Sequence, residues 1–244
     1  MPHLEGLPLI YGIHPHEVST DQKHQLGSKG ISADGRVYRY AQNGDVAIGP
    51  GLLCVAPDIT ALHEDLAVNT FLVGATSITV TIGATAIVAG EYEEGFVNIT
   101  DDSGQGIMYA IAHCPAIGAA GGNIVIRLSE PIRVVAVAGT TVTLMRNKYR
   151  YLRASDVNQL DMPVGVMNVT LPVDYYGWLQ VKGPCSILVD TNDTTAGQYI
   201  TNGDTVIGAV ETRNATAEPI VGIQPIGNNA DPAEYGSYEL MLDY

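Results

Sequence analysis

The sequence predicts an all-β protein, in which an extended N-terminal arm is followed by two small β-barrel or β-sandwich domains. Three observations predict this fold class. Short segments rich in Val, Ile and Thr alternate apolar and polar side chains with the period of two that is typical of strands. Gly, Asp or Pro separates these segments at the spacing of a small barrel or sandwich. With 244 residues, of which 46% are apolar, the chain can build a core without metals or disulfides.

The first part of the chain is residues 1–69. It holds five of the six His, contains many Gly and polar residues, and shows only brief strand segments such as residues 36–41 (RVYRYA). We therefore expect an extended arm that is ordered by contact with another subunit. Residues 58–68 are a short helical candidate within it, capped by Asp58.

Residues 70–145 are expected to form the first β-domain. Each predicted strand is short, rich in β-branched residues and bounded by turn residues. The segments are residues 77–82, 95–100, 106–113, 123–129, 132–137 and 140–145.

Residues 146–244 are expected to form a second, more acidic β-domain. The boundary is placed in RNKYRYLR, residues 146–153, which follows a strand-rich run and precedes a polar stretch. Residues 155–160 are a second helical candidate, too short to form a helical layer. One long sandwich across both domains is the alternative. The predicted strands are residues 177–182, 184–190, 205–210, 219–224 and 237–242.

The charge balance limits the classes of partner. The chain carries 12 basic and 26 acidic residues, a formal net charge of −14, which repels phosphates and argues against nucleic acid as a partner. No apolar run is long enough to span a membrane, and the N-terminal residues lack the basic region of a signal peptide. We therefore expect a soluble protein that is made in the cytoplasm and has no membrane partner.

A cluster of basic residues interrupts this acidic chain near the domain boundary. It is either a strand edge protected by cations, followed by a solvated linker, or a docking surface for an acidic partner. Between Arg127 and Arg153, Glu130 is the single acidic residue in the sequence. The basic residues are Arg127, Arg133, Arg146, Lys148, Arg150 and Arg153.

The aromatic residues are mostly tyrosines, with 13 Tyr against 2 Phe and 1 Trp. Tyr suits surfaces that are half apolar and half wet, and protein interfaces favour it. Paired tyrosines either close the ends of two small cores or lie in a subunit interface, and residues 175–176 are one such pair. The residues predicted for the interface are Tyr38, Tyr40, Arg146, Tyr149, Tyr151 and Arg153.

Known catalytic motifs are missing from the sequence. It has no G-x-S-x-G elbow, no H-E-x-x-H, no P-loop, and no G-x-G-x-x-G between a strand and a helix. Cys54, Cys114 and Cys185 lie too far apart for a zinc knuckle or a disulfide framework, so we expect buried thiols. We therefore expect no catalytic residues and no enzyme activity.

Two groups of residues in the sequence could ligate a metal, but neither is expected to do so. Asp101 and Asp102 could ligate Ca²⁺, but the spacing and terminal Glu of an EF-hand are absent. His14 and His16 could ligate a metal in an extended chain, but without a carboxylate or Cys in register a solvated or interface role is favoured. The sequence thus predicts neither a metal nor a cofactor.

Residues 163–190 (PVGVMNVTLPVDYYGWLQVKGPCSILVD) carry a resemblance to a known family. The strand 177–180 (GWLQ), flanked by Gly165 and Gly183 and followed by a Gly/Thr-rich loop and a last strand at 235–242, resembles head decoration and related structural proteins of tailed bacteriophages. Residues 36–57 also look like the opening of such proteins.

This resemblance implies a β-rich cement protein without catalytic residues. Such a protein assembles on the outer surface of a capsid as an oligomer, often a trimer, so the expected partners are the major capsid protein and other copies of this chain. The expected location is the virion, after synthesis in the host cytoplasm. Two alternatives stay open. One is a receptor-binding or carbohydrate-adhesion module of a virion fibre with a sugar near Trp178, and the other is a β-sandwich glycoside hydrolase that uses two carboxylates.

Overall fold

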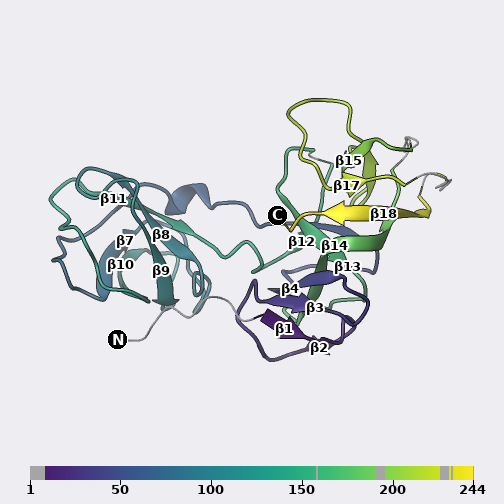
Figure 1. Cartoon of the computed structure of the whole chain (residues 1–244). Coiled ribbons are helices and arrows are strands. Elements are labelled where there is room, and N and C mark those ends of the chain that lie inside the picture. Colours follow the sequence, from purple (N-terminus) through teal and green to yellow (C-terminus); the bar gives the residue numbers. More distant parts are fainter. Residues whose placement is uncertain (1–8, 158, 191–195, 226–230, 232, 244) are drawn as a thin grey trace. The chain divides into compact units, whose positions relative to one another are not determined.

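A computed structural model describes residues 9–157, 159–190, 196–225, 231 and 233–243 (Figure 1). Eighteen strands and one 3₁₀ turn, Ala61–His63, make up the regular structure of these residues. The prediction of an all-β fold is confirmed. In the described part of the chain, no helix has the length and apolar character that a membrane crossing requires.

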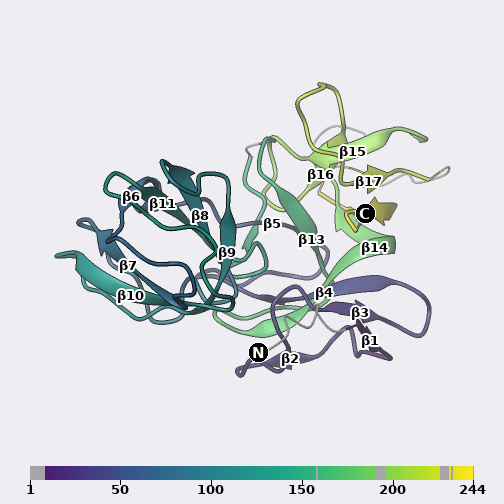
Figure 2. The ribbon, with the colours of Figure 1, turned by 60° about the vertical axis from the view of Figure 1, so that its left-hand side comes forward.

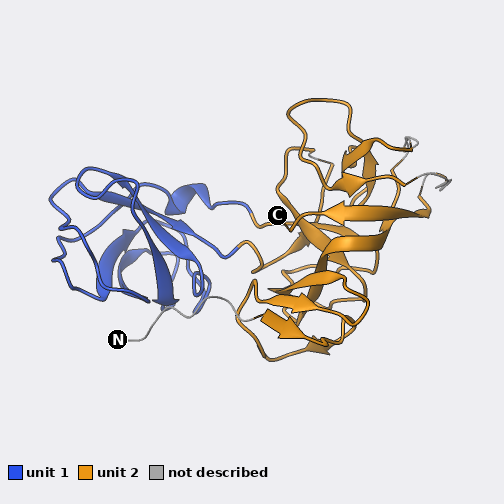
Figure 3. Cartoon of the chain, viewed as in Figure 1, with its two compact units in different colours: residues 1–6, 58–147 blue, residues 7–57, 148–244 orange. Residues whose placement is uncertain are grey.

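The chain divides into two compact units (Figure 3). The inserted barrel contains residues 58–147, and the discontinuous unit contains the described residues of 9–57 and 148–243. Strand β5 (Leu53–Val55), just before the insertion, pairs antiparallel with β12 (Arg153–Ala154), just after it. The barrel is therefore an insertion between two neighbouring strands of the other unit.

The inserted barrel is one sheet in the order β6-β11-β8-β9-β10-β7 (Figure 2). An antiparallel bridge between Val68 and Val80 joins its first and last strands, so the sheet closes on itself. Alternate side chains of each strand point into the core, as the period of two predicts. The strands are β6 (Leu66–Ala67), β7 (Ser77–Ile82), β8 (Phe96–Asp101), β9 (Met108–His113), β10 (Gly122–Leu128) and β11 (Thr141–Met145).

The discontinuous unit is built around β14, the longest strand, in a sheet with the order β1-β3-β4-β14-β18-β17-β15-β16. Strands β2 and β13 also pair with β14, and β5 pairs with β12 and β13. The remaining strands are β1 (Leu9–Tyr11), β2 (Val18–Ser19), β3 (Lys29–Ile31), β4 (Val37–Gln42), β13 (Pro163–Met167), β14 (Tyr176–Leu188), β15 (Tyr199–Asn202), β16 (Val210–Thr212), β17 (Gly222–Ile223) and β18 (Tyr235–Met241).

Strand β14 serves two cores. Its first half, which pairs with β4, is buried on both faces, whereas its second half, which pairs with β18, alternates between buried and exposed side chains. The halves meet at Gly183, whose φ of +93° lies in the region that favours glycine. Trp178 belongs to the core of the first half and Ile187 to that of the second.

The structure differs from the expected N-terminal arm. Residues 9–55 contribute five strands to the discontinuous unit, and residues 58–69 belong to the barrel. Strand β4 is buried because β3 and β14 flank it, and β14 lies almost 140 residues further along the chain. These strands are not evident from the local sequence, because partners such as β14 lie far away in the chain.

Four other expected elements do not form as predicted. Residues 205–210, expected as a strand, lie in a turn up to Val210, where β16 begins. The helical candidate at 58–68 reduces to the 3₁₀ turn, since Leu66 pairs with Val142 in the sheet. Residues 155–160 form no helix in their described part. Residues 132–137 form no strand, although Ile132 and Ala136 are buried.

Excision of the barrel tests the insertion. Replacing residues 58–147 with a short Gly/Ser linker should leave the discontinuous unit folded, because β5 and β12 remain neighbours and neither core of that unit uses a barrel residue. The excised chain should keep its β-type circular dichroism and unfold in one cooperative step followed by the fluorescence of Trp178, the only tryptophan. A chain without cooperative unfolding would contradict the division into two units.

Candidate functional site

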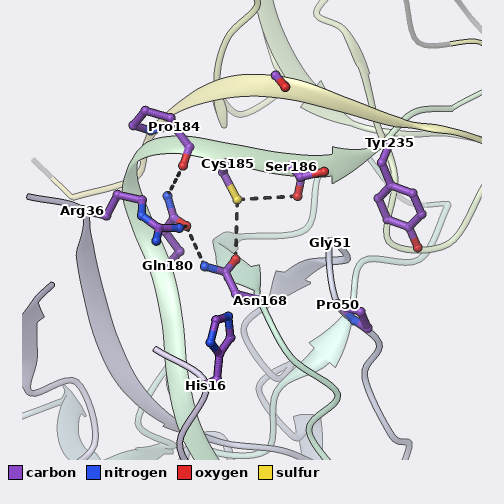
Figure 4. Close-up of a pocket in the computed structure, with 11 residues that line it drawn as sticks. His16, Arg36, Pro50, Gly51, Asn168, Gln180, Pro184, Cys185, Ser186 and Tyr235 are labelled. Carbon is purple, nitrogen blue, oxygen red and sulfur yellow. Dashed lines mark hydrogen bonds between the residues drawn. The ribbon is translucent and has the colours of Figure 1, made fainter. Parts of the chain in front are cut away.

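The discontinuous unit contains an open pocket of about 560 Å³ beside the bend of β14 (Figure 4). At the rim of the pocket, the ring of Tyr235 packs directly against the backbone of Gly51. A Cβ at Gly51, where φ is +74°, would lie 2.5 Å from that ring, so the absence of a side chain allows this contact. The residues that line the pocket are His16, Arg36, Pro50, Gly51, Asn168, Gln180, Pro184, Cys185, Ser186, Tyr235 and Ser237.

Gln180 organises the floor of this pocket. Its side chain is fully buried, and its Oε1 accepts a hydrogen bond of 2.8 Å from Asn168 Nδ2. Its Nε2 donates to the carbonyl of Pro184, also at 2.8 Å. Cys185 Sγ in turn donates to Asn168 Oδ1 at 3.8 Å, and Figure 4 shows the three side chains facing one another. The floor is therefore a connected polar network that fixes the bend of β14.

The thiol of Cys185 is not prepared for nucleophilic attack. Burial raises the pKa of this thiol to about 12, although the positive charge of Arg36 acts to lower it. The thiolate is the reactive form of cysteine, so at neutral pH this group is a protonated thiol. Cys54 and Cys114 are likewise buried and free, and burial raises the pKa of Cys114 to about 11. The prediction of buried thiols is confirmed.

A glycoside hydrolase requires two carboxyl groups about 5–10 Å apart across a substrate cleft. Among the described residues that line this pocket there is no Asp or Glu, so they do not supply such a pair. The polar groups of this lining are amides, hydroxyls, one thiol, one imidazole and one guanidinium, which are able to form hydrogen bonds with a ligand.

Tyr38, Tyr40 and Tyr149, predicted for a subunit interface, are buried inside the discontinuous unit. Tyr38 accepts a hydrogen bond from Asn168 Nδ2 at 3.2 Å. The ring of Tyr40 stacks on Tyr176 with centroids 6.1 Å apart. These three side chains close the core of their own chain, so their rings are not available to a second subunit.

The other predicted interface residues are Arg146, Tyr151 and Arg153. Arg146 forms an ion pair with buried Glu91 of the barrel, and Arg153 contacts Asp161 at 3.0 Å. Tyr151 is half-buried and has a φ of +54°. The two arginines therefore already have acidic partners within the chain. Glu91 lies 55 residues from Arg146 in the sequence, and Asp161 lies just beyond the stretch in which Glu130 was the accompanying acid.

The two metal candidates of the sequence do not assemble. Asp101 Oδ1 accepts the N–H of Asp102 at 2.7 Å, which closes a turn at the end of β8. His14 and His16 are exposed, and His16 lies at the pocket. Neither pair belongs to a group of three ligating side chains among the described residues.

A feature that the sequence reading missed is an uncharged outer face on the inserted barrel. Cross-strand pairing places Met145, Phe96 and Ala110 in one outward row, and Thr143, Asn98 and Met108 in the next. These six residues, the uncharged barrel face, carry no formal charge. Phe96 is 40% and Met108 is 44% exposed, whereas Thr143 is buried beneath Asp65, whose N–H donates to its hydroxyl. The alternation within each strand indicates which of its side chains point outward. The rows across the sheet depend on the register between strands, which alternation does not give.

The neighbouring strands β7 and β10 continue this pattern. Val125 is opposite Thr79, and Asn123 is opposite Thr81. Among the outward-facing residues of these two strands, all of which the structure describes, Arg127 alone is charged.

Comparison of the chain with protein-family models, with curated proteins and with solved structures finds no match.

Proposed function

We propose that this protein is a non-enzymatic structural protein of a virion, which binds the outer surface of a phage capsid and stabilises it as a decoration or cement protein. The resemblance in residues 36–57 and 163–190 motivates this function. The observation that carries it is the uncharged barrel face. About 25% of the residues of an ordinary soluble domain are charged, whereas the centres of protein interfaces are depleted of charge.

The arrangement of charge in the barrel supports a docking role for its strands. Acidic residues of the barrel gather in the connections between strands, for example Glu93 and Glu94 before β8 and Asp102 after it. Acidic connections keep the free protein soluble while the six residues of the uncharged barrel face carry no charge. The barrel is thus suited to lie against another protein surface through its strands.

The proposed partners are the major capsid protein and further copies of this chain, assembled as a homotrimer on the capsid surface. The trimer follows from the resemblance alone. Synthesis takes place in the host cytoplasm, and the location of function is the virion.

Binding to capsids tests this proposal. Added to particles that lack it, the protein should bind at a fixed number of copies per capsid subunit, and it should raise the temperature at which the genome is released, because a ligand of the assembled state stabilises that state. Replacing both Phe96 and Met108 with Glu should weaken binding at least tenfold, since it places unpaired charges in an apolar contact.

Val46→Glu is the matched control, because Val46 is exposed but belongs to the discontinuous unit. The control should bind like the unaltered protein. Normal binding by the double Glu variant would show that the barrel face is not the contact. Failure of the unaltered protein to bind or stabilise the particles would overturn the decoration function.

A receptor-binding or carbohydrate-adhesion module is the second candidate, and the pocket is the observation that favours it. Trp178 is only 1% exposed, so the expected sugar platform at this residue is not available. The 54% exposed ring of Tyr235, beside Ser186 and Ser237, offers another platform. Binding of a glycan that Tyr235→Ala abolishes, together with no binding to capsids, would favour this candidate.

A further inference from the structure

We propose that Asp190, Asp204 and Glu211 form a Ca²⁺ site in the discontinuous unit. One carboxylate oxygen from each residue lies within 4.8 Å of the others. Ca²⁺ takes oxygen ligands at about 2.3–2.6 Å, so oxygens on opposite sides of one ion lie up to about 5 Å apart. The three oxygens can therefore surround a single Ca²⁺ ion. Mg²⁺ usually keeps several waters and binds one or two carboxylates, whereas Ca²⁺ takes larger sets of carboxylate oxygens, so three carboxylates favour Ca²⁺.

The fold brings these three residues together from separate segments. Asp190 follows the end of β14, Glu211 lies within β16, and Asp204 lies in the connection between β15 and β16. The backbone N–H of Asp190 donates to the carbonyl of Val210 at 2.9 Å, which joins the end of β14 to β16.

Asp190 also orders the connection that carries Asp204. Its Oδ2 accepts the backbone N–H groups of Thr205 at 2.9 Å and Val206 at 3.1 Å. Gly203 lies so close that a Cβ there would be 2.2 Å from the same oxygen. The position of Asp204 relative to Asp190 is therefore set by backbone contacts.

A buried hydroxyl beside the cluster is the independent observation that points to a ligand. Thr201 is completely buried, and its Oγ1 has no hydrogen-bond partner among the residues that the structure describes. The register of β15 and β16 places Thr201 directly opposite Glu211, so both side chains leave the sheet on the same face. Leaving a buried hydroxyl without a partner is unfavourable. A bound Ca²⁺, directly or through one of its waters, gives this oxygen a partner.

Burial and charge favour the same ligand. Asp190 and Glu211 are buried. Two ionised carboxylates that share a buried site repel each other in a medium of low dielectric constant. A divalent cation between them replaces this repulsion with attraction. Gln159 Nε2 donates to Glu211 Oε1, which orients the carboxylate as outer-shell partners do in metal sites. Asp204 is exposed, so the ion can enter from solvent on that side.

Titration of the full chain, freed of metal with a chelator, tests the site. We expect CaCl₂ to produce a saturable heat of binding with one ion per chain, and to raise the unfolding temperature with increasing concentration. Equal or tighter binding of MgCl₂ would overturn the assignment to Ca²⁺. Absence of both the heat and the temperature shift would overturn the site.

Two variants separate a metal role from a structural one. Asp204→Asn should weaken Ca²⁺ binding at least tenfold and leave the metal-free unfolding temperature unchanged, because Asp204 is exposed. Thr201→Val, which removes only the hydroxyl, should weaken Ca²⁺ binding without lowering metal-free stability. Asp21→Asn, at an exposed site in another part of the unit, is the control and should bind normally. Unchanged affinity in Asp204→Asn would refute the proposal.

Discussion

Replacing Gln180 with Leu is expected to lower the free energy of unfolding of the discontinuous unit by about 3 kcal/mol. Each buried polar group that loses its partner costs about 1–3 kcal/mol. The substitution removes the acceptor of Asn168 Nδ2 and the donor to the carbonyl of Pro184. Leu is close to Gln in size, so the loss arises from the network and not from a cavity.

Denaturant unfolding followed by the fluorescence of Trp178 measures this effect, because the only tryptophan lies in the same unit. Gln105→Leu, an exposed position in the barrel, is the control and should change the midpoint little. Tyr38→Phe should cost about 1 kcal/mol, since it removes one hydroxyl from the same network. An unchanged midpoint for Gln180→Leu would show that the network does not stabilise the bend of β14.

The sequence was sufficient to predict the fold class and many strands of the barrel. The alternation in residues 77–82 and 123–129 is local, and these segments are β7 and β10, which pair with each other. Residues 132–137 show the limit of this reasoning. The N–H of Ile132 donates to the carbonyl of Ala75, and the N–H of Ala136 donates to the carbonyl of Phe71. These isolated hydrogen bonds hold the segment against a loop and do not add a strand to the sheet.

The insertion was beyond local reasoning because it depends on distant pairs. Alternation identifies a strand but not its partner, and β5 pairs with β12 across the whole barrel. Local alternation alone therefore predicts an arm around Tyr38 and Tyr40, whereas β14 pairs with this segment in the structure. The pocket was hidden for the same reason, since its lining extends from His16 to Ser237.

Replacing Asp243 with Asn is expected to lower the free energy of unfolding by about 2–3 kcal/mol at neutral pH. The side chain of Asp243 is 5% exposed and bridges Lys29 and Arg39, and Arg39 Nε donates to it at 3.1 Å. These two cations are directly opposite each other on β3 and β4, so without the carboxylate their like charges repel. The loss lies below the 3–5 kcal/mol of a fully buried pair because both cations remain partly exposed.

The pH dependence of this loss identifies the charge as its cause. Burial by itself would raise the pKa of Asp243, but hydrogen bonds from Lys29 and Arg39 outweigh it and hold the pKa below its ordinary value. A lowered folded-state pKa contributes stability that is complete above the unfolded pKa of about 4 and is lost as the pH falls through the folded value. The difference between the Asn variant and the unaltered chain should therefore be largest at neutral pH and shrink in acid.

Urea unfolding at pH 7 and at about pH 3, followed by the fluorescence of Trp178, measures both parts of this expectation. Asp45→Asn, which removes an exposed carboxylate from the same unit, is the matched control and should change stability little at either pH. A loss for Asp243→Asn that is equal at both pH values would assign the effect to packing. In that case the ion pairs of Asp243 with Lys29 and Arg39 would not stabilise the packing of Asp243 against β3 and β4.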